Sequence, residues 1–133
     1  MKNLLFILCF SFFVGHELDA VTQAEWQLLY GFRDLDQAIA EPLFVGLHVP
    51  MFALLIALAW SDRTPIREGS RLLLAGFAVI HTGLHHALRQ HPLYSFDSVL
   101  SQALIIGCGL LGLAYVLVYC MSLTKLRRPL PAL

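Results

Sequence analysis

Charged side chains are scarce in this sequence of 133 residues, where Asp, Glu, Lys and Arg together make up 14%. Soluble domains average about 25%. The formal net charge is zero, so the basic surface that nucleic-acid binding requires is missing, and we expect no nucleic-acid partner. Hydrophobic residues reach 58% and the mean hydropathy is +0.70. Long apolar runs with so few charges predict a protein whose main partner is the lipid bilayer.

Cysteine is also infrequent, and its three positions are far apart: Cys9, Cys108 and Cys120. The absence of a CxxC pair argues against a zinc knuckle and against a redox motif. All three lie in apolar stretches, so we expect small, buried, hydrophobic side chains.

Four apolar segments predict an all-α fold, an integral membrane four-helix bundle. The expected spans are about 4–21, 42–60, 71–88 and 98–123, within a single membrane domain over residues 1–124, followed by a basic, proline-containing tail over 125–133. The first segment also resembles a secretory signal. A cut after Ala20 would place Leu18 where a small residue is needed, so we expect an uncleaved helix.

The segment between the first two spans mixes apolar and charged residues, which predicts a short amphipathic helix at the membrane interface. Pro42 is a natural residue for the first turn of the second span. Pro50 lies inside that span, where it would kink the helix.

The distribution of positive charge predicts the orientation. Two of the nine Lys and Arg residues, Arg33 and Arg89, fall on one side of the predicted bundle. The other seven fall on the opposite side: Lys2, Arg63, Arg67, Arg71, Lys125, Arg127 and Arg128. We therefore expect both termini to be cytoplasmic.

Histidines in three of the spans fall at a similar predicted depth. With a rise of about 1.5 Å per residue, His16 lies about 18 Å above the inner edge of the first span. On the same scale His81 lies at about 13 Å and His85 at about 20 Å. His48 lies about 21 Å up if the hydrocarbon core is about 30 Å thick. Ionisable residues in hydrocarbon are costly, so a shared layer in the outer half of the bilayer indicates a functional site.

Helical spacing also places these groups on common faces, because residues three or four apart are neighbours. His81 and His85 are spaced i,i+4, and His16 and Asp19 are spaced i,i+3. Histidine with carboxylate is a donor set for a divalent metal such as zinc, iron or manganese. The candidate ligands are His16, His48, His81 and His85, with Glu17 and Asp19 as further ligands or partners of a ligand's second nitrogen.

Other polar residues receive less specific interpretations. Glu17 or Asp19 could serve as an acid or base if the site is catalytic. His86 and Gln102 are secondary candidates, either beside the cluster or in contact with a neighbouring helix. We expect Glu25 and Glu41 to be solvated or capping residues.

Small residues in the last span allow close approach of another helix. They form two small-xxx-small patterns, Ala103 with Gly107 and Cys108 with Gly112. These patterns predict either packing within the bundle or the face of a homodimer.

Several short stretches resemble an uncharacterised family of small bacterial four-helix membrane proteins. They are His16-Glu17-Leu18-Asp19-Ala20-Val21, Glu25-Trp26, Leu47-His48-Val49-Pro50 and His81-Thr82-Gly83-Leu84-His85. The resemblance implies four spans and the bacterial inner, cytoplasmic membrane. It implies no activity or cofactor.

Three functions are consistent with these observations. The first is a metal-binding protein or metal-dependent membrane enzyme that uses the histidine and carboxylate cluster. The second is a b-type haem protein, in which His48 and either His81 or His85 would bind the iron. The third is a non-catalytic assembly subunit, in which the polar residues form hydrogen bonds between helices.

Overall fold

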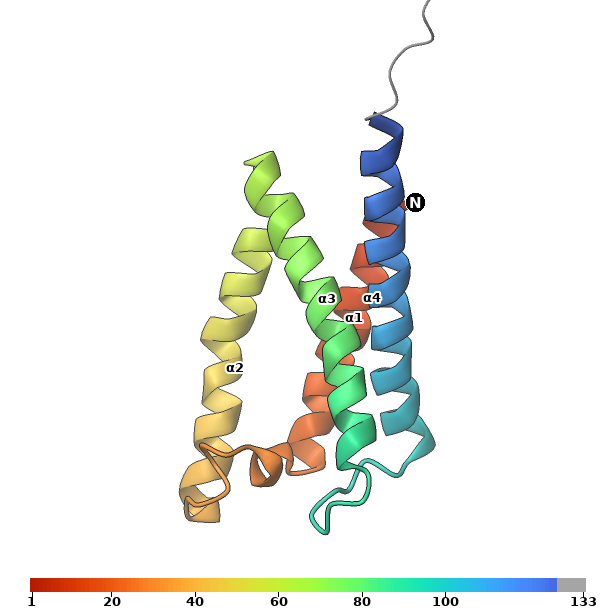
Figure 1. The fold of residues 1–133 in the computed structure, drawn as a ribbon. Coiled ribbons are helices and arrows are strands. Elements are labelled where there is room, and N and C mark those ends of the chain that lie inside the picture. Colours follow the sequence, from red (N-terminus) through yellow and green to blue (C-terminus); the bar gives the residue numbers. More distant parts are fainter. Residues whose placement is uncertain (127–133) are drawn as a thin grey trace, which may run out of the picture.

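The computed structural model describes residues 1–126, and all regular secondary structure in this part of the chain is helical. The elements are α1 (Lys2–Thr22), the 3₁₀ helix η1 (Glu25–Leu28), α2 (Gln37–Ala59), α3 (Thr64–Leu88) and α4 (Val99–Leu126). The four α-helices run alternately in opposite directions, and the N-terminus lies at the same end as the close of α4 (Figure 1). The predicted tail over 125–133 lies outside the described residues except for the last two residues of α4.

Two helices begin earlier than the sequence predicts. Asp36 caps α2, because its carboxylate accepts a hydrogen bond from the Ala38 backbone N–H at 2.8 Å. The prediction that Pro42 begins this helix is wrong, since both Pro42 and Pro50 lie inside α2. In α3 it is Pro65 that occupies the first turn, seven residues before the apolar run begins at Leu72.

The connection between α1 and α2 contains less helix than predicted, because η1 is four residues long. It follows Ala24, whose φ of 53° lies in the left-handed region that non-glycine residues seldom adopt. This turn directs η1 back toward the bundle, and the Trp26 side chain is buried there against Phe44.

Close contacts between α1, α3 and α4 form the main core. Phe6 and Phe13 of α1 and Tyr115 of α4 are buried there together with Leu74 of α3. The glycines of α4 allow the helices to approach: a Cβ added at Gly112 would lie 2.6 Å from the Ala75 carbonyl oxygen of α3. α2 makes few contacts with α1 and packs mainly on α3.

Gly107, Cys108 and Gly112 of α4 therefore make contacts within the chain. A Cβ added at Gly107 would overlap the Phe12 ring, and Cys108 is buried against Cys9. Ala103 is exposed. The homodimer predicted through Ala103, Gly107, Cys108 and Gly112 stays a prediction. Of the cysteines, Cys9 and Cys108 are buried as expected, whereas Cys120 is exposed.

Three helical segments are long and apolar enough to cross a membrane: Lys2–Thr22, Gln37–Ala59 and Val99–Thr124. α3 is absent from this set, and its first turns carry Arg67, Glu68 and Arg71. Arg71 is nevertheless buried. It donates hydrogen bonds to the Ala59 carbonyl at 2.8 Å and to the Asn3 side-chain oxygen at 3.0 Å, so its charge is well solvated by the protein.

Candidate metal centre

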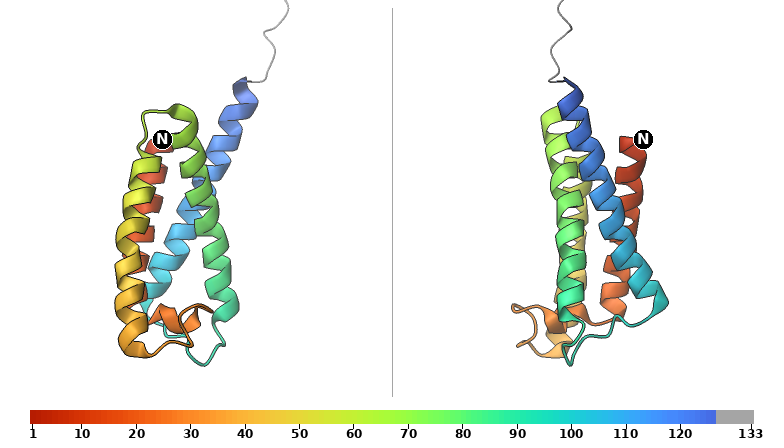
Figure 2. Two further views of the ribbon diagram at one scale, coloured as in Figure 1. Left: turned by 90° about the vertical axis from the view of Figure 1, so that its left-hand side faces the viewer. Right: turned by 45° about the vertical axis from the view of Figure 1, so that its right-hand side comes forward.

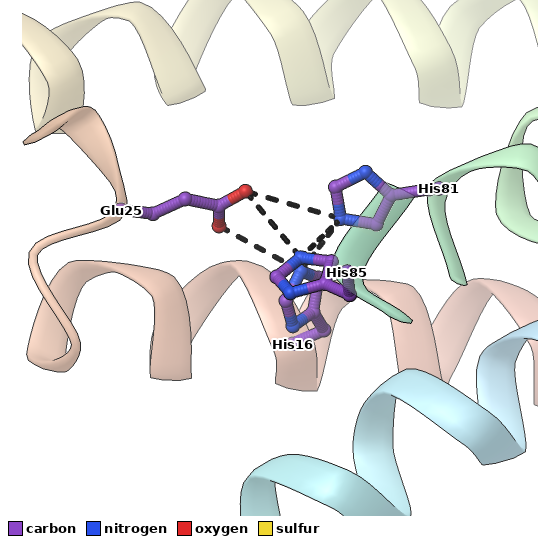
Figure 3. A group of neighbouring side chains, drawn as sticks. All are labelled: His16, Glu25, His81 and His85. Carbon is purple, nitrogen blue, oxygen red and sulfur yellow. Dashed lines mark hydrogen bonds and ion pairs between the residues drawn. The ribbon is translucent and has the colours of Figure 1, made fainter. Parts of the chain in front are cut away.

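Four side chains converge at the end of the bundle where η1 lies. His16 comes from α1, Glu25 from η1, and His81 and His85 from α3 (Figure 3). One potential ligand atom from each of the four lies within 4.8 Å of all the others. Three separate segments therefore supply a group of three imidazoles and one carboxylate.

The distances between these atoms lie on both sides of the value for a tetrahedral metal site. Ligand atoms about 2.1 Å from a zinc ion at tetrahedral angles would lie about 3.4 Å apart. The Nε2 atom of His81 lies 2.8 Å from that of His16 and 3.1 Å from that of His85. The Oε2 atom of Glu25 lies 3.7 Å from the Nε2 atom of His16, and its Oε1 atom lies 4.0 Å and 3.5 Å from those of His81 and His85. No two of the ligand atoms of the group are more than 4.8 Å apart, so shifts of the side chains would bring the four donors around one ion.

Three of the four side chains are almost inaccessible. The exposed fraction is 1% for His16, 3% for His85 and 8% for Glu25. A buried charge is costly unless it has a partner, and the imidazoles are the partners here. Burial raises the pKa of Glu25, but contact with His85 and attraction to the imidazoles lower it by more, so this pKa lies below its ordinary value. The carboxylate is therefore held as an anionic donor.

The second ring nitrogens of the histidines differ in their surroundings. His85 Nδ1 lies 3.4 Å from the Tyr94 hydroxyl, which comes from the loop between α3 and α4. Such a contact orients a ligating imidazole through its outer nitrogen. In the described chain His16 Nδ1 is buried without a hydrogen-bond partner. His16 is instead fixed by ring contacts with Phe96 and with the other two imidazoles.

His48 lies outside the group of four. Its Nε2 lies 2.9 Å from the Glu17 carboxylate, and its Nδ1 lies 2.7 Å from the Phe44 carbonyl oxygen. A carbonyl oxygen only accepts, so Nδ1 carries a proton and Nε2 faces Glu17. These two residues form a pair of their own beside the centre. The geometry therefore favours a separate pair over the predicted role of His48 and Glu17 as ligands of one ion with the other histidines.

The remaining predicted residues also lie outside the group. Asp19 accepts a hydrogen bond from the Gln23 side chain at 3.3 Å. Gln102 accepts from Arg89 at 2.9 Å and donates to the Phe96 carbonyl, and His86 is exposed. His86, Arg89 and Gln102 line a cavity of about 270 Å³, which His85 also lines.

Glu25 is the residue that sequence reasoning missed. The prediction that it is a solvated or capping residue is wrong, because it is buried among the three histidines. The pattern of apolar and polar residues around Glu25 does not indicate that its side chain lies among the histidines. The available signal was its place in the Glu25-Trp26 stretch, one of those that carry the family resemblance. Glu41, which received the same interpretation, is exposed.

Comparison with known proteins assigns the chain to a protein family. The model of a family of unknown function, DUF6713, matches residues 2–122. The chain belongs to the DUF6713 family. This match includes all four residues of the centre and all four α-helices apart from the last residues of α4. No curated protein and no solved structure matches the chain.

Proposed function

We propose that this DUF6713 protein is an integral membrane metalloprotein that binds one divalent transition-metal ion through His16, His81, His85 and Glu25. The observation that carries the proposal is the convergence of three imidazole Nε2 atoms and a carboxylate on one point. A neutral imidazole carries one N–H, so three such rings facing one another cannot all be well paired by hydrogen bonds. One metal ion would accept a lone pair from every member of the group.

The donor set favours zinc, iron or manganese over calcium or magnesium, because imidazole nitrogen suits the transition metals. An ion held there would supply Lewis-acid chemistry, the basis for a metal-dependent enzyme. The haem alternative has less support. Its axial ligands would be His48 and either His81 or His85, but both ring nitrogens of His48 already have partners, the Glu17 carboxylate at 2.9 Å and the Phe44 carbonyl oxygen at 2.7 Å.

Elemental analysis of the full chain, purified in detergent, tests this proposal. We expect about one zinc, iron or manganese ion per chain, because the four donors can satisfy a four-coordinate ion. The absorption spectrum should lack a Soret band. A chain that stays metal-free after incubation with excess of each of the three ions would contradict the proposal, and would favour a purely structural role for the cluster.

We further propose four membrane spans with both termini in the cytoplasm of a bacterial inner membrane. The apolar residues of α3 that face outward support a fourth span: Leu73, Phe77, Ile80 and Leu84 are 42% to 76% exposed. Such a stripe would be costly in water and is natural against lipid. In this orientation the metal centre lies near the outer face of the membrane.

Accessibility of one introduced cysteine at a time tests the orientation, since Cys9 and Cys108 are buried. In a Cys120→Ser background, Asp34→Cys introduces a thiol before α2 and Asp62→Cys introduces one between α2 and α3. Both positions are exposed. We expect a membrane-impermeant maleimide to label Asp34→Cys in intact spheroplasts, and Asp62→Cys after permeabilisation alone. The reverse pattern would show the opposite orientation.

A further inference from the structure

An apolar groove of about 670 Å³ lies between α1, α2 and α3 and adjoins the metal centre. α2 and α3 meet near the turn that joins them and diverge toward their other ends (Figures 1 and 2). The volume is within the range of about 300–1,000 Å³ that small-molecule sites occupy. Glu25 and His81 belong both to the metal centre and to the wall of this groove. An occupant would therefore reach two of the four donors.

The polar groups of the groove form one band with apolar side chains on both sides. Among the described residues, the polar members of the lining are Glu17, Glu25, His48 and His81. Leu29 and Phe32 lie on the loop side of this band, and Phe13 and Leu54 lie deeper in the bundle. A matching occupant is mainly apolar, with its apolar part against the deeper wall and its polar group at this band.

The groove is open to the surroundings of the helices and has the length of a single leaflet. Leu47, Leu54 and Leu84 line it and are still 49%, 58% and 52% exposed. Along α2 the lining runs from Phe44 to Leu54, which is about 15 Å of helix. That length is half of a hydrocarbon core of about 30 Å. Because α1 and α2 are long and apolar enough to span the membrane, the opening would face acyl chains.

We propose that this groove binds a neutral fatty acyl lipid, with its chain along the deep apolar wall and its ester or hydroxyl oxygens at the polar band. Two carboxyl groups, Glu17 and Glu25, line the band, so an uncharged oxygen group fits better than an anionic head group. This inference rests on the proposed membrane metalloprotein and names the class of its ligand or substrate.

A photoreactive monoacylglycerol tests the groove. The metal-loaded full chain is reconstituted in phosphatidylcholine vesicles with monopalmitoylglycerol that carries a diazirine in its chain, and the cross-linked peptides are identified by mass spectrometry. We expect cross-links on the segment Leu47–Leu54 and near Phe13, and competition by unlabelled monopalmitoylglycerol. Leu47→Trp fills the groove and should lower the yield on these peptides about tenfold.

Val49→Trp is the matched control, because Val49 lies two residues away on the same helix, is 72% exposed and is not part of the groove. It should label like the wild type. If Leu47→Trp does not fold, Leu54→Trp replaces it. Labelling spread over all helices, or without competition, would show contact with bulk lipid and overturn the proposal.

Metal content is measured in the same samples, which separates the two proposals. A loaded centre without selective labelling overturns the lipid site alone, whereas selective labelling of a chain that binds no metal overturns the metal centre alone.

Discussion

His85→Ala is expected to purify without a bound metal ion, whereas His86→Ala retains it. His85 presents its Nε2 atom to the centre and is 3% exposed, so its loss removes a donor that no neighbouring side chain replaces among the described residues. Removing a mere partner of a ligand typically costs 10–100-fold in affinity, so loss of the ligand itself should cost more than about 100-fold. Elemental analysis and competition with a chelator of known affinity measure the change.

His86→Ala makes a close control, because this histidine is adjacent on the same helix and exposed, outside the group of four. The helical content of both variants, from circular dichroism in detergent, establishes that they are folded. Equal metal affinity in both variants would contradict the assignment of His85. His48→Ala should also keep the ion, since His48 pairs with Glu17 instead.

Gly112→Ala is expected to destabilise the contact between α3 and α4 strongly. The new methyl group would lie 2.6 Å from the Ala75 carbonyl oxygen and 3.2 Å from the Ala78 Cβ, and a backbone atom cannot move aside without shifting the helix. Overpacking of this kind typically costs about 1–3 kcal/mol, and a backbone clash belongs at the upper end of that range. The unfolding midpoint in detergent, followed by tryptophan fluorescence, should fall clearly.

Gly76→Ala is the control for the same chemical change on α3. A Cβ added at Gly76 meets nothing within 4 Å, and replacing a helical glycine by alanine favours the helix by about 1 kcal/mol. Its unfolding midpoint should equal or exceed that of the wild type. If Gly112→Ala unfolds at the same temperature as Gly76→Ala, the close approach of α3 and α4 at this point is wrong.

The sequence by itself determined the all-helical class and part of the centre. Helical periodicity is local, so the spacing of His81 and His85 was enough to place both on one face. The rise per residue is local as well, and it brought His16 to the same layer. These three residues are the histidines of the converging group.

Only the tertiary structure decided which fourth residue joins them. His48 lies on α2, which makes few contacts with α1. Its Nε2 atom contacts the Glu17 carboxylate instead of the centre. Depth along a helix says nothing about the lateral distance between helices, which side-chain packing sets. Glu25 takes the fourth place because the chain turns back at Ala24 with a positive φ, a conformation that alanine does not signal.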